Sequence, residues 1–129
     1  MKEIYNSIIA VVLTTFLYLV GGLDVAMICL LVAIMLDYIS GVIKAYVTKQ
    51  LSSQIGFRGI LKKVAILIIV MLAVLVDRVT GDTGAIRTIV IYYFVANEGL
   101  SIIENLGQAG VPIPQSIKKA LKALKKENK

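Results

Sequence analysis

The sequence lacks several residues on which catalytic and metal sites depend. Its 129 residues include no histidine and a single cysteine, Cys29. Zinc sites draw mainly on cysteine and histidine, so neither a metal centre nor a cysteine–histidine catalytic pair is expected. A single cysteine cannot form a disulfide framework. Because no nucleophile–base pair and no phosphate-binding loop is present either, we predict that the protein is not an enzyme and uses no cofactor.

Charge is scarce over long parts of the chain, where apolar residues replace it. Apolar residues make up 58% of the sequence and its mean hydropathy is +0.86, which predicts an integral membrane protein. The net charge of +6 does not indicate a nucleic-acid partner, because the basic residues follow no reader motif. They cluster between apolar segments and at the C-terminus, where anionic lipid is the expected partner.

Four segments are long and apolar enough to be membrane-spanning helices. About 20 helical residues cross a hydrocarbon core of about 30 Å. We predict an all-α fold with spans at about 4–20, 25–47, 60–80 and 85–106, within a transmembrane domain of residues 1–114. Three spans would remain if the first segment were a cleaved signal peptide or the fourth lay flat on the membrane. No Ala-x-Ala-like cleavage site follows the first segment, so we favour a retained helix.

The second predicted span carries an acid near its middle. Asp37 is followed by Ser40, Gly41 and Lys44 at a spacing that places all four on one helix face. A central aspartate opposes insertion by about 2.5 to 3.5 kcal/mol, whereas the apolar residues of the segment favour it by about 3 to 7 kcal/mol. We therefore expect Asp37 at bilayer depth, on a face that serves assembly or lines a pathway. The alternative is one satisfied hydrogen bond, or a protonated carboxyl without a role.

The third predicted span is flanked by charges that we expect to reach the two membrane interfaces: Lys62 and Lys63 at one end, Asp77 and Arg78 at the other. The basic stretch before it, residues 44–63, predicts a cytoplasmic loop with an interfacial half-helix. Ser52 and Ser53 in this stretch are candidate N-caps.

The fourth predicted span is the most polar. Asn97, Ser101 and Glu104 form a stripe at helical spacing, and Glu98 lies on its flank. Such a face needs protein or water beside it, so these residues are further candidates for helix contacts or pathway lining. The alternative is an amphipathic helix at the interface.

The C-terminal tail, residues 115–129, is basic and amphipathic. It is expected to lie against the inner leaflet or to remain a solvated arm, since each lysine near an anionic surface contributes about 1 kcal/mol of attraction. The lysines that would face lipid are Lys118, Lys119, Lys122, Lys125 and Lys126. With four spans and a cytoplasmic N-terminus, only Arg78 and Arg87 of the fourteen basic residues lie outside. The positive-inside rule therefore predicts that both termini are cytoplasmic.

Three segments of the sequence resemble the phage-lysis and toxin-secretion holin family: LDYISGVIKA at residues 36–45, SSQIGFRGILKK at 52–63 and NEGLSIIEN at 97–105. The resemblance covers roughly residues 26–124, with the segments in the same order and at similar spacing. It implies a homo-oligomer in the cytoplasmic membrane that opens lesions through which an endolysin or a toxin leaves the cell. An antiholin is a further candidate partner. Members of this family are commonly described with three spans.

We hypothesise that Asp37, Lys44 and Glu98 stabilise the oligomer or line the lesion, while Gly41 and Ala45 allow close helix contact. Two other interpretations stay open. A small proton-coupled transporter or ion channel would use Asp37 or Glu98 as a titrating group, although no tryptophan and no inverted repeat supports it. An accessory membrane subunit without a pore is the third.

Overall fold

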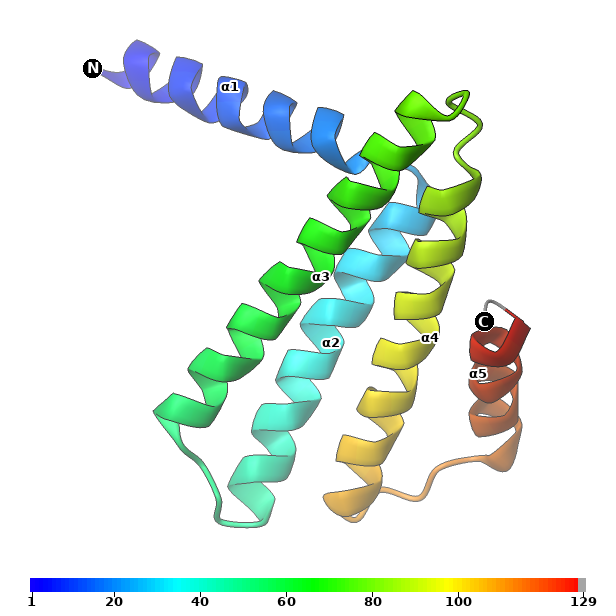
Figure 1. Cartoon of the computed structure of the whole chain (residues 1–129). Coiled ribbons are helices and arrows are strands. Elements are labelled where there is room, and N and C mark those ends of the chain that lie inside the picture. The colour runs from blue at the N-terminus through cyan, green and yellow to red at the C-terminus, as the bar shows by residue number, and fades with distance from the viewer. Residues whose placement is uncertain (128–129) are drawn as a thin grey trace.

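The computed structural model describes residues 1–127, which fold into helices joined by short connections (Figure 1). Within these residues the predicted all-α fold is confirmed. Four helices, α1 to α4, are long and apolar enough to cross a membrane, which supports a multi-pass membrane protein. The helices are α1 (Lys2–Val20), α2 (Val25–Val47), α3 (Ser53–Val79), α4 (Ala85–Gln108) and α5 (Gln115–Glu127).

Capping groups explain where these helices begin and end. The Asp24 carboxylate accepts the backbone N–H of Met27 at 3.0 Å and starts α2. The Ser52 hydroxyl accepts the N–H of Ile55 at 3.4 Å and starts α3. Helix α3 therefore begins seven residues, about two turns, before the predicted span 60–80. It includes the second half of the stretch 44–63, for which the sequence predicts a loop with an interfacial half-helix.

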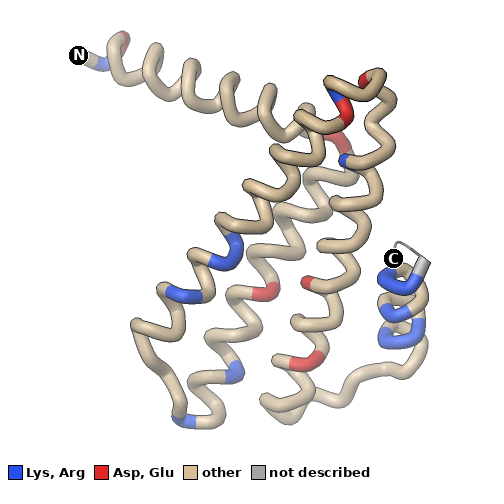
Figure 2. Tube along the Cα trace, viewed as in Figure 1, with Lys and Arg blue, Asp and Glu red and all other residues tan. Residues whose placement is uncertain are grey.

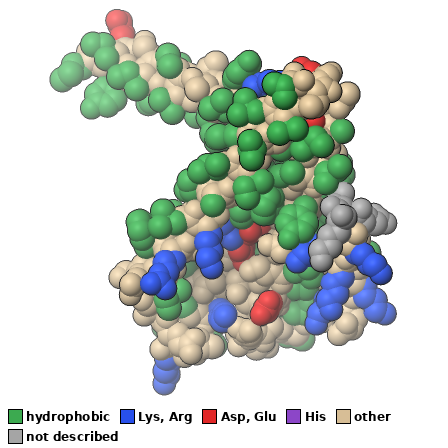
Figure 3. Space-filling view, viewed as in Figure 1, with side chains coloured by type: hydrophobic (Ala, Val, Ile, Leu, Met, Phe, Trp, Pro, Cys, Tyr) green, Lys and Arg blue, Asp and Glu red, His purple; other side chains and the backbone are tan. Residues whose placement is uncertain are grey.

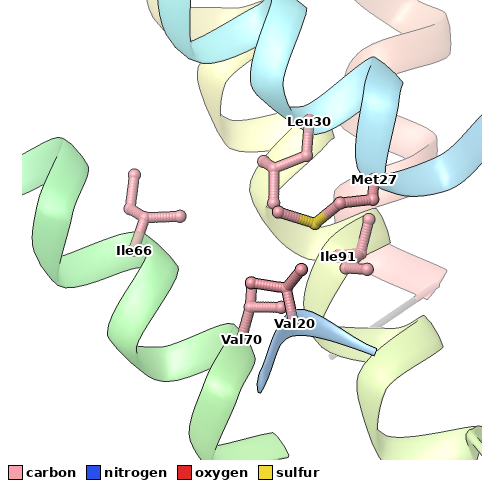
Figure 4. Packing of buried hydrophobic residues seen from close by; sticks show 6 residues of the cluster. All are labelled: Val20, Met27, Leu30, Ile66, Val70 and Ile91. Atoms are coloured by element: carbon pink, nitrogen blue, oxygen red, sulfur yellow. The ribbon is translucent and has the colours of Figure 1, made fainter. Parts of the chain in front are cut away.

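Helices α2, α3 and α4 lie side by side, and α1 leaves this bundle at a steep angle (Figure 1). Helix α4 packs against both α2 and α3. The apolar core lies at the end of the bundle near the α1–α2 connection, where buried side chains from all four helices meet (Figure 4). They are Val20, Met27, Leu30, Ile66, Val70 and Ile91.

The outer surface of the bundle is apolar as well. Apolar side chains cover α1 and much of the face seen in Figure 3. Most charged side chains on this face lie toward the end of the bundle that is farther from α1. Only 6% of the apolar stretch of α1 is buried. Exposed apolar surface of this extent is a feature of proteins that are covered by lipid or by other chains.

Helix α5 is placed differently from the expectation for the tail. Instead of lying apart from the spans, α5 folds back along α4 (Figure 1). Its Leu121 packs against Gly99 of α4 so closely that a Cβ on Gly99 would come within 2.8 Å of Leu121 Cδ2. The physical reason is local: the apolar face of α5 finds a flat site on α4 where no side chain protrudes.

Candidate functional site: a charged cluster inside the bundle

Three charged side chains from three helices meet inside the bundle. Lys63 of α3 forms ion pairs with both Asp37 of α2 and Glu98 of α4. Asp37 and Glu98 each lie ten residues before the end of their helix, and Lys63 lies ten residues after the start of its own. At about 1.5 Å per residue the three share a level about 15 Å from that end of the bundle. Figure 2 shows the acidic positions of α2 and α4 and the basic positions of α3 at this level.

Neutral polar groups complete the cluster. The Asn105 amide donates to the Asp37 carboxylate at 3.1 Å and to the Ser40 hydroxyl at 3.1 Å. The Ser40 hydroxyl in turn donates to the backbone carbonyl of Asp37 at 2.9 Å. Ser101, one turn after Glu98, lines the same groove as Asp37 and Asn105. Every buried side-chain nitrogen and oxygen in the described part of the chain has a hydrogen-bond partner, as a polar network at bilayer depth requires.

The cluster is buried and carries an excess acid. Asp37 is 8% exposed and Glu98 is 3% exposed, while the Lys63 side chain is 17% exposed. One ammonium faces two carboxyl groups, so the attraction between unlike charges holds α2, α3 and α4 together only while Lys63 is present. Removing one partner of such a buried pair leaves an uncompensated charge in a medium of low polarity.

The candidate residues from the sequence fall into two groups. Asp37, Ser40 and Glu98 come together in the cluster. Ser101 lines the adjoining groove, and Gly41 lies beside the cluster, since a Cβ there would be 3.7 Å from the Asn105 amide nitrogen. Other candidates face elsewhere. Lys44 forms no ion pair within residues 1–127, and Asn97 and Glu104 line a groove toward α5.

Lys63 is the member of the cluster that the sequence interpretation placed at the interface. The spacing of the buried residues along α3 could have identified it. Ile66, Val70 and Asp77 are buried, and Lys63 precedes Ile66 by three residues on the same face. Lys62 lies off that face and is exposed. The pairing itself depends on how three helices pack, so it could not be read from any one of them.

A groove leads from the α2–α3 loop to the cluster. Its volume is about 870 Å³, and its lining runs from Gln50 and Ser52 in the loop to Asp37, Lys63 and Asn105. Lys44 lies on its wall. Water entering by this groove can reach the charged groups from one end of the bundle, whereas the apolar core closes the other end. Within residues 1–127 no group of acidic or cysteine side chains is arranged to hold a metal ion.

A second polar cluster lies at the opposite end, around Arg87 at the start of α4. Its guanidinium donates to the backbone carbonyls of Val20 at 2.6 Å and Gly22 at 3.0 Å, and to the Asp24 carboxylate at 2.8 and 3.1 Å. The hydrogen bonds from Arg87 lower the pKa of Asp24 below its ordinary value. Gly21, at φ 85°, leaves room for the guanidinium, since a Cβ there would lie 2.6 Å from the Arg87 Nε.

Asp77 and Arg78 reinforce this end of the bundle. The Asp77 carboxylate accepts the backbone N–H groups of Ile86 at 2.9 Å and Arg87 at 2.8 Å, which caps α4 from the neighbouring helix α3. The Arg78 guanidinium donates to the Tyr18 carbonyl at 2.6 Å and lies 3.9 Å from the centre of its ring. These contacts fix the end of α1 and the α1–α2 connection to α3 and α4, while the rest of α1 stays free of the bundle.

Comparisons with known proteins give a consistent picture. The sequence profile of the bacteriophage holin family matches residues 14–126. A probable holin of Bacillus phage phi105 is 36% identical over 99 residues, which cover 77% of this chain and 73% of that protein. An uncharacterized 14.9 kDa protein of Clostridium perfringens is 47% identical over 112 residues, which cover 86% of this chain and 85% of that protein. No solved structure matches the chain.

Proposed function

The chain belongs to the bacteriophage holin family, as the three sequence segments predicted, and we propose that it oligomerises in the cytoplasmic membrane and opens protein-permeable lesions. Family membership points to a non-enzymatic pore-forming protein. The proposed cargo is an endolysin or a toxin, and an antiholin is the proposed regulatory partner.

The observation that supports this proposal is a buried charge cluster, in which Lys63 contacts both acids, inside helices whose outer surface is apolar. While the chain is dilute in the membrane, Lys63 satisfies Asp37 and Glu98 within one molecule. When copies assemble, the same polar faces of α2 and α4 can be wetted as the wall of a lesion, which a purely apolar helix could not offer. Lys44 on the wall of the groove that reaches Asp37 is a further candidate for such a wall, and Asn97 and Glu104 are candidates on the side of α4 that faces α5.

We also propose that both termini are cytoplasmic. The α2–α3 loop and the α4–α5 linker lie at one end of the bundle (Figure 1), and the Lys and Arg positions of residues 44–63 and of α5 lie toward it along the chain trace (Figure 2). Arg78 and Arg87 lie at the other end, where they contact the end of α1. The positive-inside rule assigns the basic end to the cytoplasm. The proposal for the N-terminus rests on the predicted first span, because α1 returns the N-terminus to that side if it crosses the membrane.

Inducible expression in a bacterial host tests the proposal. Membrane potential and viability are followed with and without a cytoplasmic cell-wall hydrolase that lacks a signal peptide. We expect an abrupt depolarisation after a delay, and lysis only when the hydrolase is present. Steady growth, or depolarisation without release of the hydrolase, would contradict a protein-permeable lesion.

Replacing Asp37 by asparagine is expected to advance the onset of lysis and to change the size of the oligomer. The Asp37→Asn side chain still accepts a hydrogen bond from Lys63 but without charge, which weakens the contact by about 1 to 2 kcal/mol. Lysis time and cross-linked oligomer size are the measurements. Asp82→Asn is the matched control, because Asp82 is exposed in the α3–α4 loop and makes no ion pair in the described structure. Unchanged timing and oligomer size for Asp37→Asn would rule out a role for this carboxylate.

The groove that reaches Asp37 from the loop also favours a second candidate, a small proton-coupled transporter or ion channel. In that case water in the groove would deliver protons or ions to the cluster without any protein-sized opening. Proton or ion flux at low expression, without delayed killing, would favour it over the holin proposal.

A further inference from the structure

A second groove, between α4 and α5, has the composition of a site for an anionic group. Its volume is about 610 Å³. Lys118, Lys122 and Lys125 of α5 line one wall, and Glu104 of α4 is the only acid among the described residues of the lining. Positive charge therefore exceeds negative charge inside the groove, and an anion would be attracted into it.

The other lining residues suit a lipid rather than a free ion. Leu100, Ile103 and Ile113 supply apolar surface beside the lysines, and the groove is open to the outside. In Figure 3 the basic side chains of α5 gather along one side of the lower half of the molecule. A ligand with an anionic head and an apolar chain would satisfy both parts of this lining at once.

The position of α5 sets the depth of the lysines. Lys118 and Lys122 lie three and seven residues after the start of α5, about 5 and 10 Å along its axis from the end of the bundle that holds the α4–α5 linker. This is the headgroup region of the inner leaflet if α4 spans the bilayer. Lys125, further along, is already occupied, since its ammonium donates to the Asn97 amide oxygen at 3.0 Å and lies 5.7 Å from the centre of the Tyr93 ring. Lys118 and Lys122 are the cations left for a ligand.

We propose that the groove between α4 and α5 binds the phosphate headgroup of an anionic phospholipid, with Lys118 and Lys122 on the phosphate and the apolar lining along an acyl chain. This differs from general attraction of a basic tail to a membrane, because the site exists only while α5 is packed on α4. The flat contact between Gly99 and Leu121 holds that packing. The proposal requires residence in a membrane and is independent of lesion formation.

Native mass spectrometry of the purified full-length chain tests the site. The chain is held in neutral detergent micelles and titrated with phosphatidylglycerol, with phosphatidylcholine, or with inorganic phosphate. We expect retention of phosphatidylglycerol and not of phosphatidylcholine. Lys118→Gln with Lys122→Gln is expected to weaken retention by roughly tenfold or more. Lys119→Gln with Lys126→Gln removes the same charge from lysines that do not line the groove, and is expected to leave retention nearly unchanged.

A further variant distinguishes the effect of the packed groove on lipid retention from the effect of the lysine charges. Gly99→Leu places a large side chain where Leu121 lies, so it is expected to displace α5 and to abolish retention although every lysine is kept. Equal losses for the two double-lysine variants would overturn the proposal, because attraction would then be diffuse. Full retention by Gly99→Leu would also overturn it. Retention of inorganic phosphate as strong as the retention of phosphatidylglycerol would overturn the assignment of the site to a lipid.

Discussion

A Lys63→Met chain is expected to accumulate poorly in the membrane and to open no lesions. Lys63 is the cation shared by Asp37 and Glu98, so its loss leaves two buried carboxyl groups facing each other inside the bundle. Removing one partner of a buried ion pair destabilises a protein by about 3 to 5 kcal/mol. A folded domain is typically stable by only about 5 to 15 kcal/mol, so most of its stability could be lost. Membrane content by immunoblot and lysis after induction are the measurements.

Two further chains make this prediction specific. Lys62→Met removes the same charge from the adjacent exposed position and is expected to behave as the unmodified chain does. Combining Lys63→Met with Asp37→Asn and Glu98→Gln removes all three charges and is expected to restore accumulation, because no uncompensated charge remains. If Lys63→Met alone accumulated and lysed cells at the usual time, the cluster would not be what holds α2, α3 and α4 together.

An Arg87→Met chain is expected to lose the attachment of α1 to the bundle. The Arg87 side chain is 11% exposed and donates to the carbonyls of Val20 and Gly22 as well as to Asp24. Hydrogen bonds from charged groups contribute about 1.5 to 3 kcal/mol each, so losing several of them should lower the unfolding temperature strongly. Amide hydrogen exchange of residues 18–24 is the sharper measurement, and we expect protection there to fall first.

Arg78→Met is the comparison for this second prediction. Among the residues described, Arg78 has its hydrogen bond and its cation–π contact with Tyr18, and it is less buried than Arg87. A smaller loss of protection is therefore expected. Equal protection of residues 18–24 in Arg87→Met and in the unmodified chain would contradict the role of Arg87.

The Arg87–Asp24 contact also predicts a dependence on pH. The pKa of Asp24 in the folded protein lies below its ordinary value of 3.8, chiefly because the Arg87 side chain donates to its carboxylate. A lowered pKa means that the contact contributes fully to the stability of the fold above pH 3.8. This contribution is lost as the pH falls through the pKa of Asp24 in the folded protein. In the unmodified chain, protection of residues 18–24 against amide exchange should therefore fall as the pH drops below 3.8. In Asp24→Asn, which has no carboxylate at this position, the same drop in pH should cause no such loss.

Periodicity and capping together made the helices predictable from sequence. The predicted span 25–47 coincides with α2, whose start is fixed by Asp24 in the adjacent connection. Helix α3 starts at the candidate cap Ser52, before the predicted span 60–80, and Lys63, which the sequence places at an interface, pairs inside the bundle. A charge within an apolar run marks an interface only if nothing inside the protein pairs with it.

The parts of the site that the sequence does not predict are contacts between segments far apart in the chain. Asp37 and Glu98 could be predicted from their place in apolar helices, but their common partner Lys63 depends on the relative rotation of three helices. The same holds for Asp77, which caps α4 from another helix, and for α5. The sequence predicts an amphipathic α5, but its packing partner depends on the space that Gly99 of α4 leaves for Leu121.

Co-release from lipid vesicles tests the central proposal most directly. Vesicles are loaded with a small dye and a folded cell-wall hydrolase, and the purified full-length chain is added at increasing density. We predict that both cargoes leave together above a threshold density, since a lesion wide enough for a folded protein does not retain a dye. Release of the dye alone, or proton flux with both cargoes retained, would contradict a protein-permeable lesion and favour a channel or transporter.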